Sequence, residues 1–164
     1  MQIHGVIHQF PKELKLLILV FVSVLSIGFF GGISFVNDTT SSNPRGIEER
    51  YLGNENDEEA TKMMFKKSSG EIKTLVHNHI LSLSVIFFLV ALILATTSVH
   101  MKLKLFLMIE PFISVICTFG GIYFMWLGIT WMKYIVMLSG ILMTVTYIVS
   151  VFFILKSILT PQKS

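Results

Sequence analysis

The chain has 164 residues and a formal net charge of +3, with 53% hydrophobic and only 14% charged residues. Soluble domains carry about 25% charged residues, so this composition predicts an integral membrane protein. The basic residues cluster beside apolar segments and form no stripe, which argues against nucleic-acid binding. The single cysteine, Cys117, has no partner for an intrachain disulfide, and we expect it to pack as a small side chain.

The first apolar segment runs from Leu16 to Val36 without a charged residue. At 1.5 Å per residue it covers roughly 31 Å, which matches a hydrocarbon core of about 30 Å. A cleaved signal peptide would have an apolar core of only about 7–15 residues, followed by a small-residue cleavage site. We therefore expect an uncleaved membrane span over residues 15–36, with Pro11 near the start of its helix.

Residues 37–74 form the only sizeable polar segment, with eight acidic and six basic residues. Its first part, residues 37–44, is rich in turn-forming residues, and we expect it to be loosely ordered. Residues 47–67 are compatible with a helix that has a few apolar contacts. We expect a short helix there, lying across the mouth of the bundle.

Three further spans are expected, over about residues 75–98, 105–127 and 134–156. Only Lys133 separates two uncharged stretches, residues 111–132 and 134–155, whereas helix connections take about two to eight residues. The third helix must therefore end near Leu127 and Gly128, and must begin near Leu105 to cross the bilayer. This register draws Glu110 into the membrane.

Lysine pairs flank the spans, and four spans place all three pairs on one side of the membrane: Lys12 and Lys15, Lys102 and Lys104, and Lys156 and Lys163. The positive-inside rule then puts both termini in the cytoplasm. We predict one domain over residues 1–164. It is an all-α, four-helix transmembrane bundle with up-down-up-down topology and a partly helical extracytoplasmic loop over residues 37–74. The expected location is the bacterial cytoplasmic (inner) membrane.

His77 and His79 lie at the outer end of the second predicted span. They point about 160° apart on a helix, so we expect one to face the bundle and the other the headgroups. This spacing does not suit a shared metal ion, and we predict no metal site. The inward histidine is a candidate ligand for haem b or a partner for a quinone. The alternative is an interfacial histidine bonded to the loop or to a neighbouring helix.

A bis-histidine haem would need a second histidine at the same depth, and the other predicted spans have none there. His100 lies at the opposite face of the membrane. A haem would therefore need a methionine ligand, Met125 or Met137, or a partner protein.

Glu110 is the only carboxylate inside a predicted span, and Pro111 beside it favours a kink. A carboxylate at this depth is paired, protonated or active in proton movement. We expect a structural pair with Lys156, or hydrogen bonds to the hydroxyls of residues 96–98. A role with protons or a quinone is the alternative.

Small residues collect in the outer half of the predicted bundle: Gly28, Gly31, Gly32, Gly120, Gly121, Ser139 and Gly140. Such residues let helix backbones approach closely inside a membrane, and we expect tight packing there. The alternative is room for a flat ligand such as a porphyrin or quinone ring.

Three motifs carry a family resemblance: HNHILSLS from His77, LFLMIEPF from Leu105, and TFGG from Thr118. Together they resemble a group of small, uncharacterised bacterial four-span membrane proteins. The resemblance covers the second to fourth spans. It implies that the histidine pair and the Glu-Pro pair belong to the same structural arrangement. The resemblance brings no assigned activity to this chain.

The sequence has no GxSxG, phosphate-loop or dinucleotide-binding motif, so we expect a non-catalytic protein. The favoured function is that of an accessory subunit that packs in a larger, possibly respiratory, membrane assembly, beside a membrane protein partner or a second copy. The first alternative is a redox subunit that binds haem or quinone through His77 or His79. The second is a small transporter or channel, which would require oligomerisation and more polar residues at membrane depth.

Overall fold

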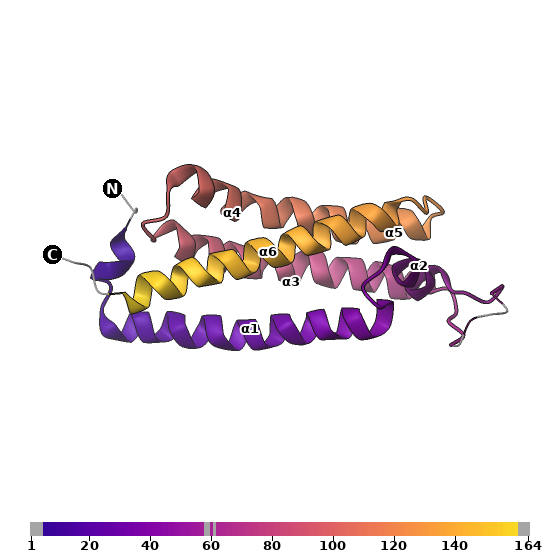
Figure 1. Ribbon diagram of the computed structural model, residues 1–164, viewed down its shortest axis with the longest axis horizontal. Coiled ribbons are helices and arrows are strands. Elements are labelled where there is room, and N and C mark those ends of the chain that lie inside the picture. Colours follow the sequence, from indigo (N-terminus) through magenta and orange to yellow (C-terminus); the bar gives the residue numbers. More distant parts are fainter. Residues whose placement is uncertain (1–4, 58–59, 61, 161–164) are drawn as a thin grey trace.

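The computed structural model describes residues 5–57, 60 and 62–160, and all its regular elements there are helical. Four helical rods run along the long axis of the molecule (Figure 1). Each is long and apolar enough to cross a membrane. The predicted four-helix transmembrane bundle is thereby confirmed. The rods are α1 (Lys12–Thr40), α3 (Ser69–Ala95), the third rod made of α4 (Met101–Val115), η2 (Ile116–Gly120) and α5 (Gly121–Trp126), and α6 (Met132–Leu159).

The helix ends differ from the limits of the predicted spans by one to six residues, and a polar cap explains the largest difference. At the start of α3, Ser68 accepts a hydrogen bond from the Glu71 backbone, and the Glu71 side chain accepts one from the Ser68 backbone. This capping box starts the helix at Ser69, six residues before the predicted span. Helix α1 continues to Thr40, through residues expected to be loosely ordered. The loop therefore shrinks from residues 37–74 to residues 41–68.

The short helix in the loop is α2 (Pro44–Leu52), which begins and ends earlier than predicted. Asn43 caps it by accepting a 2.7 Å hydrogen bond from the Gly46 amide, and Pro44 occupies its first turn. Gly53, with a left-handed φ of 81°, ends it. Helix α2 contacts α1, α5 and α6. It therefore lies against the mouth of the bundle, as expected.

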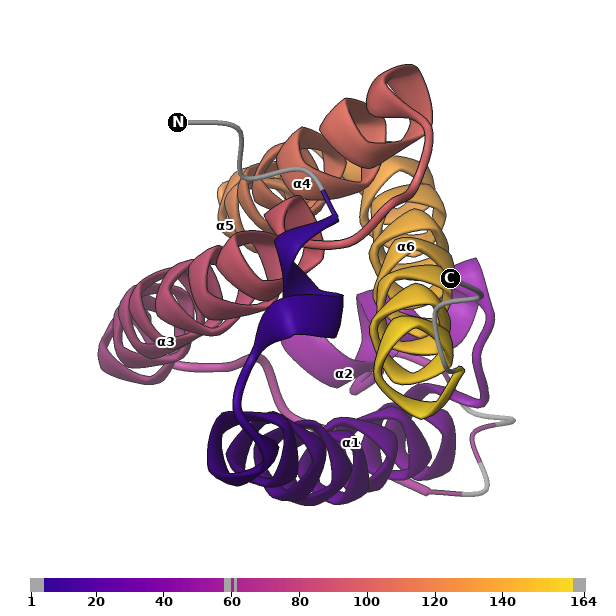
Figure 2. The same ribbon diagram turned by 90° about the vertical axis from the view of Figure 1, so that its left-hand side faces the viewer.

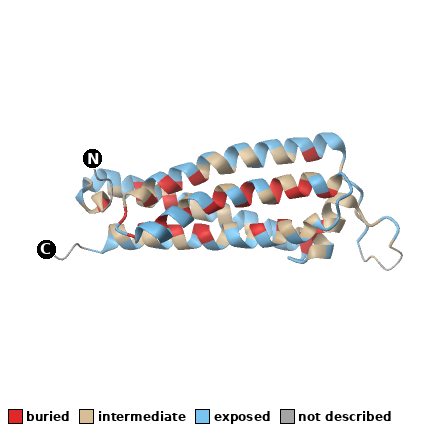
Figure 3. Ribbon diagram, turned by 90° about the horizontal axis from the view of Figure 1, so that it is seen from above, coloured by how far each residue is buried: buried red, intermediate tan, exposed pale blue. Residues whose placement is uncertain are grey.

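Helices α3, α6 and the third rod form the compact part of the bundle, and α1 lies beside them (Figure 2). Only 11% of the apolar window of α1 is buried, against 50% for the third rod. Figure 3 shows buried residues scattered along the visible rods among exposed and half-buried ones. Tyr147 of α6 connects α1 to the rest, because its ring stacks on Phe29 and its hydroxyl lies 3.0 Å from that of Ser26. Helix α1 is therefore attached along a narrow seam.

The short helix η1 (Val6–Gln9) and the end of α6 lie at one end of the bundle, and α2 lies at the other (Figure 1). We call these the terminal end and the loop end. This arrangement agrees with the predicted up-down-up-down order.

The third rod contains a wide π-helical turn, η2, that the sequence did not reveal. Pro111 was expected to kink the helix, yet it lies inside the continuous α4, and the wide turn begins at Ile116. The rod ends at Trp126, and Gly128 follows with a φ of 109°, so the predicted helix end is confirmed.

Candidate functional site

Glu110 lies at the interface between α4 and α6 and is 5% exposed. Its Oε2 atom is 2.6 Å from Oγ1 of Thr146, and its Oε1 atom is hydrogen bonded to the hydroxyl of Ser114. The predicted partners are wrong. Thr96 and Thr97 donate their hydroxyl hydrogens to carbonyls of α3, and the side chain of Lys156 is exposed. The depth of Glu110 in the membrane could be predicted from the sequence, whereas the direction of its side chain could not.

A second polar contact joins the same two helical rods nearer the loop end. The hydroxyl oxygens of Thr118 in η2 and Ser139 in α6 lie 2.7 Å apart, and both residues are buried. Ser139 also lies 2.7 Å from the carbonyl oxygen of Ile135. Because a hydroxyl has one hydrogen, Ser139 donates to Ile135 and accepts from Thr118. The third rod and α6 are thus joined by two buried polar contacts.

Every buried side-chain nitrogen or oxygen in the described part of the chain has a hydrogen-bond partner. The polar groups of the interior therefore bond to one another. These hydrogen bonds stabilise the bundle.

Neither histidine of the predicted pair is buried. His77 and His79 are both exposed near the loop end of α3, so the expected inward histidine is wrong. His79 is nevertheless fixed, because its ring stacks on Phe119 at 4.7 Å and its Nδ1 atom lies 2.8 Å from the carbonyl oxygen of Leu75. The carbonyl accepts, so Nδ1 carries the hydrogen and a neutral ring has its lone pair on Nε2.

No cluster of three or more potential metal ligands occurs among the residues that the structure describes.

The predicted packing role of the glycines holds for one of them. A Cβ atom at Gly121 would lie 2.8 Å from Cγ2 of Val136, so this glycine allows α5 and α6 to approach closely. The other five have no such neighbour, since a Cβ atom would meet nothing within 4 Å at Gly28, Gly31, Gly32, Gly120 or Gly140. The glycines of α1 are exposed and face away from the bundle.

The terminal end holds a buried lysine whose burial was not predicted from the sequence. Lys104 is 3% exposed, and its Nζ atom donates to the carbonyl oxygens of Ala95, at 3.0 Å, and Thr97. The backbone amide of Ile7 in η1 donates to the carbonyl oxygen of Thr96 at 3.1 Å. These donors satisfy the carbonyls left over at the end of α3. Ile7 itself is fully buried.

At the loop end, aromatic and charged side chains hold the loop onto the bundle. The indole nitrogen of Trp126 donates to the carbonyl oxygen of Lys67 at 2.7 Å, and the amine of Lys66 lies 5.3 Å from the Trp126 ring centre. Lys133, in the first turn of α6, forms an ion pair with Glu48 of α2. Burial raises the pKa of the Tyr51 phenol in the same region.

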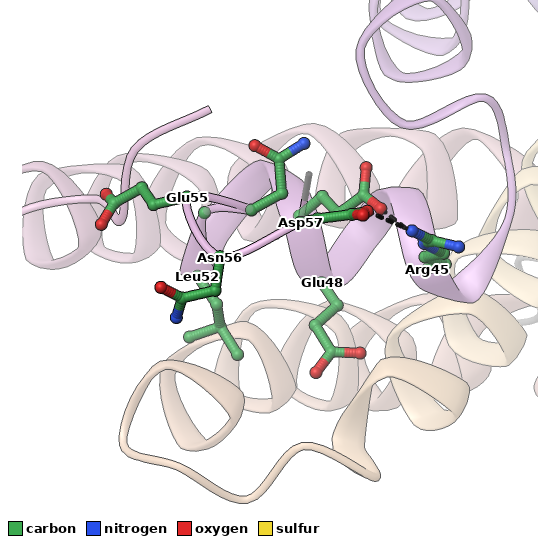
Figure 4. Close-up of a pocket in the computed structure, with 9 residues that line it drawn as sticks. Arg45, Glu48, Leu52, Glu55, Asn56 and Asp57 are labelled. Carbon is green, nitrogen blue, oxygen red and sulfur yellow. Dashed lines mark hydrogen bonds and ion pairs between the residues drawn. The ribbon is translucent and has the colours of Figure 1, made fainter. Parts of the chain in front are cut away.

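Two hollows lie on the surface of the loop, and both are lined by Arg45, Glu49, Asn54 and Asp57. Arg45 forms ion pairs with Glu49, at 2.7 Å, and with Asp57, as the close-up shows (Figure 4). The hydrogen bond to Glu49 and the charge of Asp57 raise the pKa of the Arg45 guanidinium. These charges pair with one another at the surface.

The fold and the site together define a four-span integral membrane protein. In the described part of the chain, its buried polar side chains are all hydrogen bonded within the protein. The family model that matches residues 41–164 describes a transmembrane helical domain, Aq_1264_TM, and the chain belongs to this uncharacterised membrane family. The match confirms the suspected four-span family. It covers α2 to α6 and leaves α1 outside. No curated protein and no solved structure matches the chain.

Proposed function

We propose that this protein is a non-catalytic subunit that packs in a larger membrane assembly through the outward face of α1. The observation that carries the proposal is the exposure of Gly28, Gly31 and Gly32, beside which a Cβ atom would meet nothing within 4 Å. Glycines at this spacing give a helix a flat surface on which a second transmembrane helix packs closely. Within one copy of the described chain, no helix packs closely on these three glycines.

The hydrogen bonding of the buried polar side chains to one another and to the backbone supports a structural role. Glu110 is hydrogen bonded to Thr146 and Thr118 to Ser139, and both contacts join two helices. A transporter would need polar groups that meet its substrate along a path through the membrane. In this bundle these four buried side chains instead join α6 to the third rod.

The test is purification of the full chain from its native membrane in mild detergent, followed by a native gel and identification of proteins that migrate with it. We expect the wild-type chain to migrate with a membrane protein partner or a second copy. Gly28→Leu combined with Gly32→Leu should release that partner, because leucines would fill the flat surface. The matched control is Gly140→Leu on α6, where a Cβ atom also meets nothing.

A chain that migrates alone, or a partner retained by the α1 double variant, would contradict the proposal. Loss of the partner in Gly140→Leu alone would move the interface to α6.

A redox version of this function would use His79. Its fixed ring presents an Nε2 atom that has no hydrogen-bond partner among the described residues. Because His79 is exposed, a haem b or quinone bound there would lie between this chain and its partner. An absorbance band of reduced haem in the purified assembly, lost in His79→Ala and kept in His77→Ala, would support this version. A colourless assembly would exclude the haem.

We further propose that the chain lies in the bacterial cytoplasmic membrane with the terminal end in the cytoplasm. The exposed lysines Lys12, Lys102 and Lys156 lie at that end, close to the limits of their spans. Lysines beside short connections favour the cytoplasmic side.

A further inference from the structure

We propose that Glu110 keeps a proton inside the membrane and donates a hydrogen bond to Thr146 through it, so that its carboxyl group is a neutral proton-binding site between α4 and α6. The single hydrogen of the Thr146 hydroxyl supports this assignment. Its Oγ1 atom lies 2.6 Å from Oε2 of Glu110, 2.9 Å from the carbonyl oxygen of Leu142 and 3.1 Å from that of Met143. A threonine hydroxyl has one hydrogen, and ionised carboxylates and carbonyls only accept.

If Glu110 were ionised, the Thr146 hydroxyl would meet three acceptors and would have one hydrogen for all of them. A protonated Glu110 removes the conflict. Its Oε2 atom donates to Thr146, and Thr146 donates to the carbonyl oxygen of Leu142 one turn back, a common arrangement for threonine in a helix. Ser139 uses its hydroxyl in the same way in its contact with Thr118.

The other carboxyl oxygen fits the same assignment. Oε1 of Glu110 accepts from the hydroxyl of Ser114, as expected for the carbonyl oxygen of a carboxylic acid. With Oε1 accepting and the Oε2 hydroxyl donating, the acid is satisfied by the two hydroxyls it meets. A carboxylate would offer about four acceptor positions to those same two groups.

An ionised Glu110 would also have no compensating charge. Among the described residues, no ion pair includes Glu110. Helix α6 has no charged residue from Tyr134 to Leu155, and the titratable groups in the membrane part of α3 are His77 and His79 near the loop end. An unpaired charge buried in a bilayer costs several kcal/mol, and a carboxyl group avoids this cost by keeping its proton.

The titratable groups closest in sequence to Glu110 and Thr146 are engaged elsewhere or neutral. Lys104, six residues before Glu110 on α4, directs its amine to the carbonyl oxygens at the end of α3. Tyr147, next to Thr146 on α6, contacts Ser26 of α1 through its hydroxyl. Cys117 of η2 is a half-buried thiol.

The proton and the packing of α4 on α6 are therefore linked. Removal of the proton would replace the donor at Oε2 with a charged acceptor opposite Thr146 and would leave that charge buried. The site binds a proton because the α4–α6 contact is complete only with the proton present. This inference concerns one copy of the chain and does not depend on a partner.

The test is an infrared spectrum of the full chain in detergent at neutral pH. We expect a carbonyl-stretch band of a carboxylic acid, which disappears in Glu110→Gln and remains in the control Glu13→Gln, whose side chain is exposed. Ser114→Ala should move the band to higher frequency, because the acid carbonyl loses the hydrogen bond that it accepts. This shift identifies the band even if Glu110→Gln folds poorly.

Two outcomes would overturn the proposal. One is a spectrum that contains carboxylate bands only, and the other is an acid band that neither Glu110→Gln nor Ser114→Ala changes.

Discussion

The hydroxyls of Thr118 and Ser139 lie 2.7 Å apart, eight residues after Glu110 in the third rod and seven residues before Thr146 in α6. Seven residues of an α-helix return within about 20° of the starting direction, whereas eight turn about 80° past it. The π-helical turn Ile116–Gly120 takes up the additional residue. The wide turn therefore allows both polar contacts to reach α6.

Deletion of one residue in the wide turn should consequently be tolerated. Without Cys117, the two contacts of the third rod would be seven residues apart, as they are in α6, and a regular α-helix would serve. We expect the deletion variant to keep a Tm within a few degrees of wild type in detergent. Deletion of Ile148, in the regular helix α6, should unfold the bundle because it shifts half of that helix. Equal damage by the two deletions would contradict this explanation of the turn.

The spans could be predicted from the sequence because a run of about 20 apolar residues has few uses other than crossing a membrane. The directions of their side chains could not be predicted. Apolar residues cover all faces of these rods, since lipid and protein interior favour the same residue types. One histidine of the pair and the glycines of α1 were accordingly expected to face the bundle, yet His77, His79 and Gly31 are all exposed.

A usable signal for the site was present in α6. Ser139, Thr146 and Ser150 are spaced by seven and four residues, so they share one face of an otherwise apolar helix, and all three are buried. That face meets Glu110 and Thr118. The buried Lys104 gave no comparable signal, because its neighbour Lys102 has the same charge and is exposed.

Glu110→Gln and Glu110→Ala should differ in stability if the carboxyl is neutral. The amide of glutamine can donate to Thr146 and accept from Ser114, so we expect a change in unfolding free energy below about 1 kcal/mol. Alanine removes the acceptor of Ser114 and the donor to Thr146, at a cost of about 1–3 kcal/mol for each buried hydrogen bond that is lost. Denaturant or thermal unfolding in detergent measures the difference. A Glu110→Ala variant as stable as wild type would remove any special role for this residue.

The contact between Gly46 and Thr40 predicts a sensitive position in the loop. A Cβ atom at Gly46 would lie 1.9 Å from the carbonyl oxygen of Thr40, which is far inside van der Waals contact. Gly46→Ala should therefore separate the start of α2 from the end of α1 and destabilise the loop by roughly 2 kcal/mol or more. Limited proteolysis of residues 41–68 measures this opening. Gly31→Ala is the control, since it meets nothing within 4 Å, and equal cleavage of both variants would contradict the prediction.

Replacement of Lys104 by methionine should destabilise the terminal end. The methionine keeps the apolar length of the side chain but cannot donate to the carbonyl oxygens of Ala95 and Thr97. A buried acceptor that loses its donor costs about 1–3 kcal/mol. Lys102→Met removes the same charge from an exposed neighbour and should leave the Tm unchanged. If both variants melt like wild type, the buried amine has no part in capping α3.

The sidedness of the bundle is tested by cysteines at its two ends. In a Cys117→Ser background, Asn56→Cys places a thiol on an exposed part of the loop, and Lys102→Cys places one on the exposed connection at the terminal end. A membrane-impermeant maleimide added to intact cells with a permeabilised outer membrane should label the loop position and spare the other. Disruption of the cytoplasmic membrane should then expose Lys102→Cys. The opposite pattern would place the lysines outside and overturn the orientation, because the loop and the terminal end lie at opposite ends of the same four rods.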